Sequence, residues 1–206
     1  MWADLMRRLA PEAKERLNEI MTPRTFQINE VLFFEGERGD ALYVIDEGHI
    51  LVERVTEQGD TVAMAVLGPD SVVGEQALVG DDSRGATARA VTPAAVRTLG
   101  RAPFTELRRA HPVFDELLVQ LLERRIRELN DLVLEARHRP AEDRLKRRLT
   151  EMHGLFGTVI PLTQTTLAAL AGTTRPTANG VLQHLQDAGI LELRRGKVVL
   201  SDPDAL

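Results

Sequence analysis

Between Gly74 and Ala90 the chain reads GEQALVGDDSRGATARA, a stretch in which glycines and alanines frame a few charged residues. On either side of it, from Arg24 to Leu99, short runs of β-branched and aromatic residues are separated by further glycines. The runs are Val31–Phe34, Tyr43–Ile45, Ile50–Arg54, Thr61–Leu67 and Ala94–Leu99. Short strands at a spacing of about 8–12 residues are typical of a β-sandwich or barrel. The first half of the chain is therefore predicted to form a roll of β-strands, preceded by a short amphipathic helix over Ala10–Ile20.

The composition of the 206-residue chain excludes several classes of protein. It contains no cysteine, which rules out disulfides, thiolate zinc sites, iron–sulfur clusters and cysteine nucleophiles. No apolar run approaches the ~20 residues that span a bilayer. The segment Met1–Ala10 lacks the apolar centre of a signal peptide. We therefore expect a cytoplasmic protein that does not bind membranes.

The five histidines are scattered along the chain, at His49, His111, His138, His153 and His184. A small β-barrel enzyme of the cupin type needs histidines clustered on its strands, and none of these five has the spacing of metal ligands. We therefore expect neither a metal site nor an enzyme active site.

A long helix is predicted from Pro112 to about Arg137. Along it, apolar residues recur at alternating spacings of three and four, at Val119, Leu122, Ile126, Leu129, Val133 and Ala136. This narrow heptad seam, flanked by charged residues, is typical of two helices in a coiled-coil dimer. The alternative is a helix packed on its own domain, which usually needs a wider apolar stripe. We therefore expect these six residues to form a dimer interface.

The segment Arg137–Pro140 ends the long helix, because proline disfavours helical geometry in the residue before it. We place a domain boundary here. Beyond it we expect helices over Ala141–Met152, Thr163–Ala171 and Thr174–Ala188, then a hairpin with strands Ile190–Leu193 and Lys197–Leu200. The net charge of -5 arises in the first two-thirds of the chain, whereas acidic and basic residues nearly balance after Ala141. Charge therefore permits DNA binding by the last third without arguing for it.

Three stretches of the chain resemble known motifs. The sequence GERGDALYVIDEG at positions 36–48 resembles the turn-and-strand signature of cyclic-nucleotide-binding domains, and residues 74–90 resemble their phosphate-binding cassette. Residues 162–185 resemble the Crp-type helix-turn-helix, and a β-wing follows. Together they cover nearly the whole chain, which is similar to bacterial transcription regulators of the Crp/Fnr family. The resemblance implies an α+β fold: a jelly-roll-like β-roll over 1–111, a dimerisation helix and hinge over 112–139, and a winged helix-turn-helix over 140–206.

The resemblance also implies a cyclic-nucleotide effector. The guanidinium of Arg84 would bind the cyclic phosphate as a planar fork of donors, and Glu75 would accept a hydrogen bond from the ribose 2′-hydroxyl. Gly85 stands where domains that prefer cyclic GMP tend to have threonine, so cyclic AMP is the expected effector. Leu129 replaces a residue that faces the adenine, which weakens binding by on the order of 1 kcal/mol. The implied ligand residues are Gly74, Glu75, Gln76, Ala77, Arg84, Gly85, Ala86 and, on the long helix, Asn130.

For the C-terminal part, the resemblance implies that the second helix of the motif enters the major groove of a palindromic operator. Arg175 aligns with a position that reads guanine, a contact worth roughly 1–3 kcal/mol of discrimination. Pro176 and Gly180 stand where other members have base-reading side chains, so the operator should differ from theirs or be read partly by DNA shape. The residues expected on DNA are Thr163, Gln164, Thr165, Thr174, Arg175, Thr177, Gln183, Arg194 and Lys197, with Arg195 beside them.

Ligand binding is expected to control DNA binding through the long helix. A nucleotide held by Glu75 and Arg84 would touch Asn130, shift the hinge at His138–Pro140 and set the two recognition helices of a homodimer about one DNA turn apart, ~34 Å. The alternative is a ligand-independent activator of the same fold, whose β-roll is only structural. RNA polymerase is the further partner implied for an activator. Iron–sulfur sensing, as in the Fnr branch, is excluded by the absence of cysteine.

Overall fold

The computed structural model describes residues 2–80 and 82–206, so Asp81 of the stretch quoted above lies outside the described residues. The chain divides into two compact units. One comprises Val66–Leu129 together with the chain up to Arg54, and the other comprises Val55–Ala65 and Asn130–Leu206. The first unit holds most of the strands together with several helices, and the second unit is mainly helical, which confirms the predicted α+β class.

Two four-stranded antiparallel sheets form the β-roll. The first has the order β1 (Thr22–Phe26), β8 (Ala94–Gly100), β3 (Ala41–Glu47), β6 (Val72–Val73), and the second the order β2 (Val31–Phe33), β7 (Thr87–Ala90), β4 (Ile50–Val55), β5 (Thr61–Leu67). In β3 every side chain from Ala41 to Ile45 is buried. Because alternate side chains point to opposite faces of a strand, both faces of β3 are covered. The five predicted strands are present. The sequence pattern missed β1, β6 and β7, because β1 buries only Phe26, β6 is two residues long, and β7 consists of small and polar residues.

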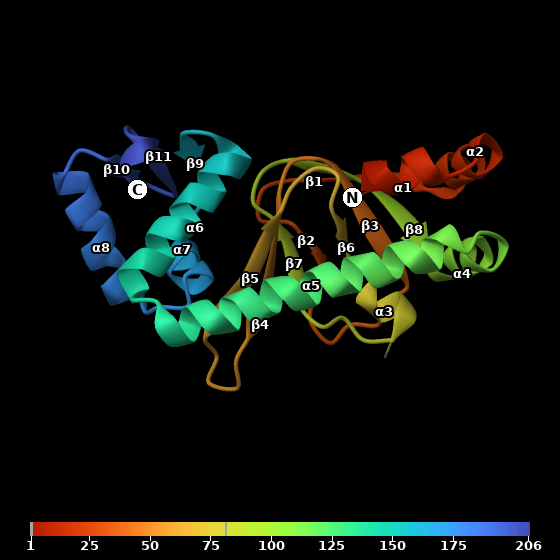
Figure 1. The fold of residues 1–206 in the computed structure, drawn as a ribbon, viewed down its shortest axis with the longest axis horizontal. Coiled ribbons are helices and arrows are strands. Elements are labelled where there is room, and N and C mark those ends of the chain that lie inside the picture. The colour runs from red at the N-terminus through yellow and green to blue at the C-terminus, as the bar shows by residue number, and fades with distance from the viewer. Residues whose placement is uncertain (1, 81) are drawn as a thin grey trace. The chain divides into compact units, whose positions relative to one another are not determined.

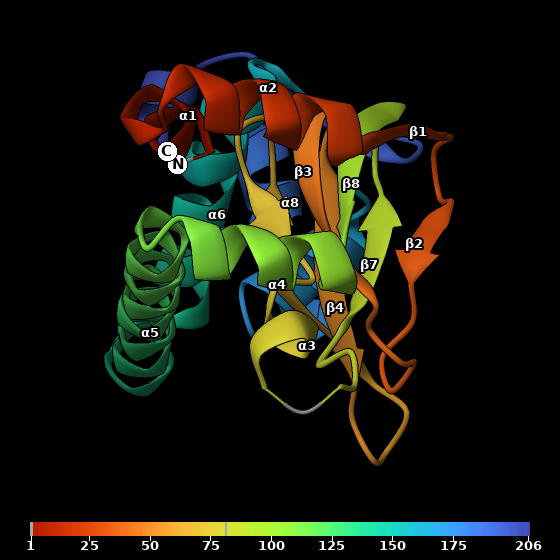
Figure 2. The same cartoon turned by 90° about the vertical axis from the view of Figure 1, so that its right-hand side faces the viewer.

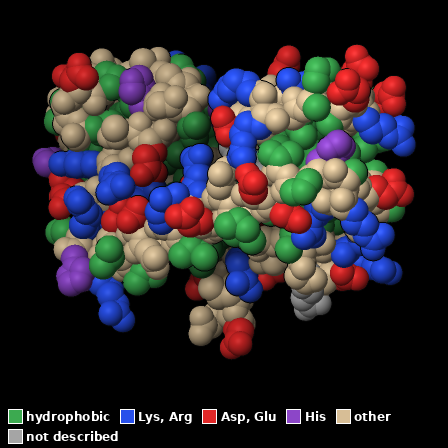
Figure 3. Space-filling view, turned by 45° about the vertical axis from the view of Figure 1, so that its right-hand side comes forward, with side chains coloured by type: hydrophobic (Ala, Val, Ile, Leu, Met, Phe, Trp, Pro, Cys, Tyr) green, Lys and Arg blue, Asp and Glu red, His purple; other side chains and the backbone are tan. Residues whose placement is uncertain are grey.

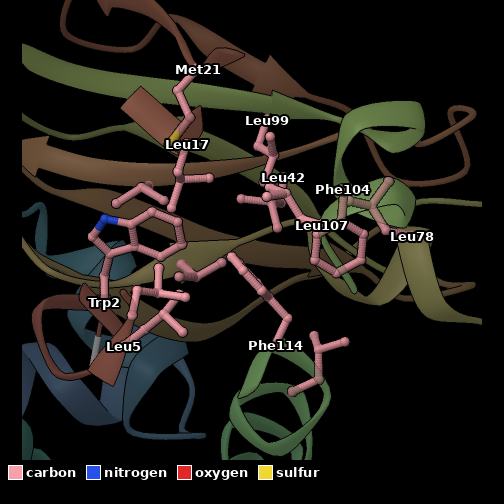
Figure 4. Close-up of a cluster of buried hydrophobic side chains, with 14 of the residues drawn as sticks. Trp2, Leu5, Leu17, Met21, Leu42, Leu78, Leu99, Phe104, Leu107 and Phe114 are labelled. Atoms are coloured by element: carbon pink, nitrogen blue, oxygen red, sulfur yellow. The ribbon is translucent and has the colours of Figure 1, made fainter. Parts of the chain in front are cut away.

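Helices α1 (Trp2–Arg8), α2 (Pro11–Ile20) and α4 (Arg101–Ala110) lie beside the β1–β8–β3–β6 sheet (Figures 1 and 2). Their apolar side chains join those of the sheet and of the long helix in one cluster (Figure 4). The predicted apolar face of α2 is buried through Ala13 and Leu17. Helix α1 was not predicted, yet Trp2 and Leu5 are buried in the same cluster. This cluster positions the start of the long helix on the β-roll.

The predicted long helix is α5, which runs unbroken from Val113 to His138 (Figure 1). Its first turns pack into the cluster through Phe114, Leu118 and Leu121, all buried. The predicted heptad seam is a different face. Three of its six residues are more than half exposed: Val119 (65%), Ile126 (58%) and Val133 (55%). The N-terminal turns of the long helix therefore pack on the β-roll unit through residues other than those of the seam, and much of the apolar seam is left exposed.

The second unit contains α6 (Ala141–Phe156), β9 (Val159–Ile160), α7 (Gln164–Leu170), α8 (Arg175–Asp187), β10 (Leu191–Arg194) and β11 (Lys197–Leu200), with a 3-10 turn at Pro203–Ala205. Strands β10, β11 and β9 form a small antiparallel sheet, the wing. Leu167 and Leu170 of α7 and Leu185 of α8 are buried. Val181 is half-exposed, because the inward face of α8 follows Ala178, Leu182 and Leu185 at helical spacing.

Candidate functional site

The stretch from Gly74 to Ala90 folds around the side chain of Arg84. Gly74 joins β6 to the short helix α3 (Gln76–Val79) with a φ of +83°, a conformation that favours glycine. A Cβ at Gly74 would lie 2.5 Å from Arg84 Nη1, and one at Gly39 would lie 3.2 Å from Arg84 Cζ. The two glycines therefore let the backbone of two turns approach the guanidinium closely.

Arg84 is a buried cation with no carboxylate within hydrogen-bond distance among the described residues. Only 3% of the residue is exposed. Its Nη1 donates to the Gly74 carbonyl at 2.8 Å, and its guanidinium stacks on the ring of Phe33 at 4.2 Å. Its Nη2 lies 4.0 Å from a carboxylate oxygen of the exposed Asp40, and its Nε is buried without a hydrogen-bond partner. Burial lowers the pKa of this guanidinium, against the opposing effect of Tyr43 and nearby carboxylates, but an arginine keeps its charge in proteins.

Glu75 is the matching buried anion, with 7% of the residue exposed. Burial raises the pKa of its carboxyl above the ordinary value, while a backbone hydrogen bond, Arg125 and Arg84 act in the opposite direction. Within the described part of the chain, no ion pair or hydrogen bond joins Glu75 to Arg84. Two opposite charges are thus buried near each other without a direct ion pair, an arrangement whose desolvation is costly and which a further polar or charged partner would stabilise.

Two arginines that the sequence analysis did not single out also belong to this site. Arg101, at the start of α4, donates to the Gly39 carbonyl at 2.7 Å and to the Ala77 carbonyl, and its guanidinium pairs with Asp82 at 2.9 Å. It therefore ties together the turn before β3, the end of α3 and the loop that leads to Arg84. Arg125 on α5 contributes positive charge near Glu75. No local motif marks either residue, since their roles come from contacts with distant segments.

The structure brings together most of the predicted ligand residues. Gln76 is exposed at the start of α3, Ala77 is buried beneath it, and a Cβ at Gly85 would lie 3.5 Å from the side-chain oxygen of Gln76. Ala86 is half-buried after Gly85. Asn130 is exposed on α5 and belongs to the second unit.

The predicted helix-turn-helix is present in the second unit as α7, a tight turn at Gly172, and α8. A threonine caps the start of each helix: the Thr163 hydroxyl accepts from the Thr166 amide at 3.0 Å, and the Thr174 hydroxyl accepts from the Thr177 amide at 3.4 Å. Arg175 opens α8 with an exposed side chain that has no partner among the described residues. Farther along α8, Gln183 donates to Asp187 at 3.0 Å. The start of α8 therefore exposes a cation that forms no hydrogen bond or ion pair among the described residues.

In the wing, the guanidinium of Arg194 is already occupied. It forms two hydrogen bonds to the Glu192 carboxylate, at 2.8 and 2.7 Å, which raise the pKa of Arg194 and lower that of Glu192. Arg195 is exposed and Lys197 half-buried at the same hairpin. More widely, basic and acidic side chains are interspersed on the face drawn in Figure 3. A phosphate contact by Arg194 would therefore require its pair with Glu192 to open.

Across residues 2–80 and 82–206, no group of three histidine or acidic side chains is placed to hold a metal ion. None of the helices described is both long and apolar enough to cross a bilayer.

Comparison with known proteins gives matches to both units. Residues 23–111 match the family model of the cyclic nucleotide-binding domain, and residues 143–206 that of the Crp-like helix-turn-helix domain. The chain is 34% identical over 195 residues to the cyclic AMP receptor protein of Thermus thermophilus, covering 92% of this chain and 88% of that protein. It is 26% identical over 212 residues to the CRP-like cAMP-activated global transcriptional regulator of Mycobacterium tuberculosis, covering 99% and 95%.

Solved structures show the same architecture. The c-di-GMP responsive global regulator CLP of Xanthomonas campestris matches with a TM-score of 0.79 at 22% identity, over 93% of this chain and 99% of that chain. The catabolite activator protein of Thermus thermophilus matches with a TM-score of 0.58 at 29% identity, over 98% and 95%. At 22% identity, the match to the Xanthomonas regulator establishes a shared fold and nothing about its ligand.

Proposed function

Because the chain belongs to the Crp/Fnr family of transcription regulators, we propose that it is a sequence-specific DNA-binding regulator whose activity is controlled by cyclic AMP bound between Glu75 and Arg84. The observation that carries this proposal is the buried guanidinium of Arg84, whose Nε has no partner and which no carboxylate neutralises closely. An uncompensated buried cation destabilises a protein that does not use it. An anionic ligand supplies the missing charge.

Each residue around the guanidinium has a chemical use in such a site. Arg84 would hold the cyclic phosphate with charge-assisted hydrogen bonds. Glu75 would accept a hydrogen bond from the ribose hydroxyl, and this bond would stabilise the charge of a buried carboxylate that lacks a direct ion pair. The small residues Gly85 and Ala86 leave their backbone amides open to the phosphate. The relatives named for cyclic AMP support this choice of nucleotide, as does the absence of a threonine at position 85.

We further propose that the protein acts as a cytoplasmic homodimer joined through the α5 seam. The exposed Val119, Ile126 and Val133 support this, because an apolar stripe along a charged helix is stabilised by a second copy of the same stripe. Leu122, Leu129 and Ala136 would complete the interface. Asn130, exposed on the same helix, would then reach a nucleotide from α5 of either subunit.

DNA reading is proposed for the exposed start of α8. Arg175 would read guanine, Thr174, Thr177 and Gln183 would add hydrogen bonds, and Thr163, Gln164 and Thr165 would meet phosphates. In the wing, Arg194 is hydrogen-bonded to Glu192, so Arg195 and Lys197 would contact DNA phosphates without first breaking an ion pair of this kind. The three functional parts are accordingly residues 1–111, 112–139 and 140–206, with RNA polymerase as a further partner if the protein activates transcription.

Thermal unfolding with and without cyclic AMP tests the sensor. At about 100 times the dissociation constant, the ligand should stabilise the protein by about 2.7 kcal/mol. Arg84→Met keeps an unbranched side chain but removes the guanidinium and its charge, and it should abolish the shift. If wild-type protein shows no shift at millimolar cyclic AMP, the sensor is wrong and a ligand-independent regulator of the same fold remains. Selection of bound duplexes from a random-sequence pool, with and without cyclic AMP, then tests DNA reading and its control.

A further inference from the structure

Arg144 on α6 donates hydrogen bonds to three backbone carbonyls that lie on two different segments. Its Nη1 donates to the Arg139 carbonyl at 2.8 Å, in the connection between α5 and α6. Its Nε donates to the Ala171 carbonyl and its Nη2 to the Gly172 carbonyl, each at 2.8 Å, in the turn between α7 and α8. One rigid, planar group therefore joins the predicted hinge to the turn of the helix-turn-helix.

The contact at the turn bears directly on where α8 begins. Ala171 is the C-cap of α7, where helix carbonyls lack intrahelical partners, and a charged donor satisfies this one. Thr174, two residues after Gly172, is the N-cap of α8. Any displacement of the 171–172 peptide therefore moves the first turn of α8, which carries Arg175.

The alternative role for Arg144 is a direct contact with a DNA phosphate, as any exposed cation on α6 could make. The geometry opposes this role, because all three of its nitrogens are directed to carbonyls of its own chain and the side chain is half-buried. Lys146, two residues later, pairs with the neighbouring Glu142 at 2.9 Å and provides a comparison of equal charge on the same helix.

We propose that Arg144 is a positioning residue that couples the hinge to the recognition helix, so that a change in the 138–140 segment is passed on to α8 instead of being absorbed in the turn. The inference rests on the proposed DNA-reading function of α8. Arg144 itself touches neither DNA nor effector. It sets how well the start of α8 is held in the orientation that reads bases.

The test compares full-length Arg144→Gln, Arg144→Lys and Lys146→Gln with wild type. Binding is measured by fluorescence anisotropy on a duplex that the wild type selects from a random pool and on a scrambled duplex, over a range of salt concentrations. Arg144→Gln should weaken binding to the selected duplex at least about tenfold, the equivalent of one charge-assisted hydrogen bond, and change binding to the scrambled duplex far less. Arg144→Lys should recover only part of the loss, and Lys146→Gln should resemble wild type.

Two further readouts separate positioning from other roles. The slope of log affinity against log salt should stay that of wild type in Arg144→Gln, whereas a lost phosphate contact lowers it by about one. Hydrogen exchange followed by mass spectrometry should show faster exchange in Arg144→Gln both at 137–143 and at 169–176. Equal weakening on both duplexes, a reduced slope, or faster exchange in only one segment would overturn the coupling. If the wild type selects no duplex, the DNA-reading function fails, and the exchange measurement still decides the coupling.

Discussion

Glu135, near the end of α5, offers a direct test of how buried charge stabilises the second unit. Its side chain is 7% exposed and contacts two arginines of α6: Arg147 Nη1 lies 2.7 Å from one carboxylate oxygen, and Arg148 donates to the other. Both arginines also pair with Glu151, whose side chain is 38% exposed. The same two cations thus have one buried and one exposed acidic partner, which form a matched pair for mutation.

Glu135→Gln should destabilise the protein by about 2–3 kcal/mol. Removing one partner of a buried ion pair costs about 3–5 kcal/mol, because the remaining charge is left without compensation. A smaller loss than this applies here, since Arg148, at 12% exposure, keeps Glu151 and glutamine keeps one acceptor oxygen. Glu151→Gln removes a more exposed partner of the same arginines and should cost less than about 1 kcal/mol.

Urea unfolding followed by far-UV circular dichroism measures both changes. Salt of about 0.5 M should remove most of the Glu151→Gln effect and little of the Glu135→Gln effect, since buried pairs are screened less. The double variant Glu135→Leu, Arg148→Met should recover much of the loss, because an apolar pair can replace a buried ion pair. Equal losses from Glu135→Gln and Glu151→Gln would refute the argument from burial.

Three further predictions concern the β-roll and the long helix. Burial raises the pKa of Glu75 above its ordinary 4.5, so the ligand-free protein should lose stability as the pH rises through that raised pKa. Glu75→Gln carries no charge to bury, and its melting temperature should therefore exceed that of wild type at neutral pH. Below pH 4.5, where the carboxyl of wild type is protonated, the two melting temperatures should be equal. Gly74→Ala should lower stability by about 1–3 kcal/mol in thermal unfolding, because φ is +83° and the new Cβ would lie 2.5 Å from Arg84 Nη1, whereas Gly85→Ala, with its Cβ 3.5 Å from the nearest atom, should be nearly neutral. Ile126→Asp should convert a dimer into monomers in sedimentation equilibrium, and an unchanged mass would contradict the proposed interface.

Features with a local signature could be predicted from the sequence. The glycine-separated runs indicated the β-roll, and five of its strands lie where the runs are. The N-caps Thr163 and Thr174 marked the starts of two helices, because a cap needs only a hydroxyl and the next turn of backbone. Elements without such a signature were missed: α1, β1 and β7 have too few apolar residues, or too small ones, to show a period, and β6 is too short to show one.

The sequence alone determined the order of the elements and the composition of the cassette, since period and turn chemistry are written in neighbouring residues. Only the tertiary structure decided which charged side chains are buried and which backbone groups they bind. Arg101 reaches a carbonyl 62 residues away, and Arg144 reaches one 28 residues away. The reason is physical: whether an arginine is a solvated surface charge or a buried bridge depends on the segments that fold over it, and its sequence neighbours do not encode them.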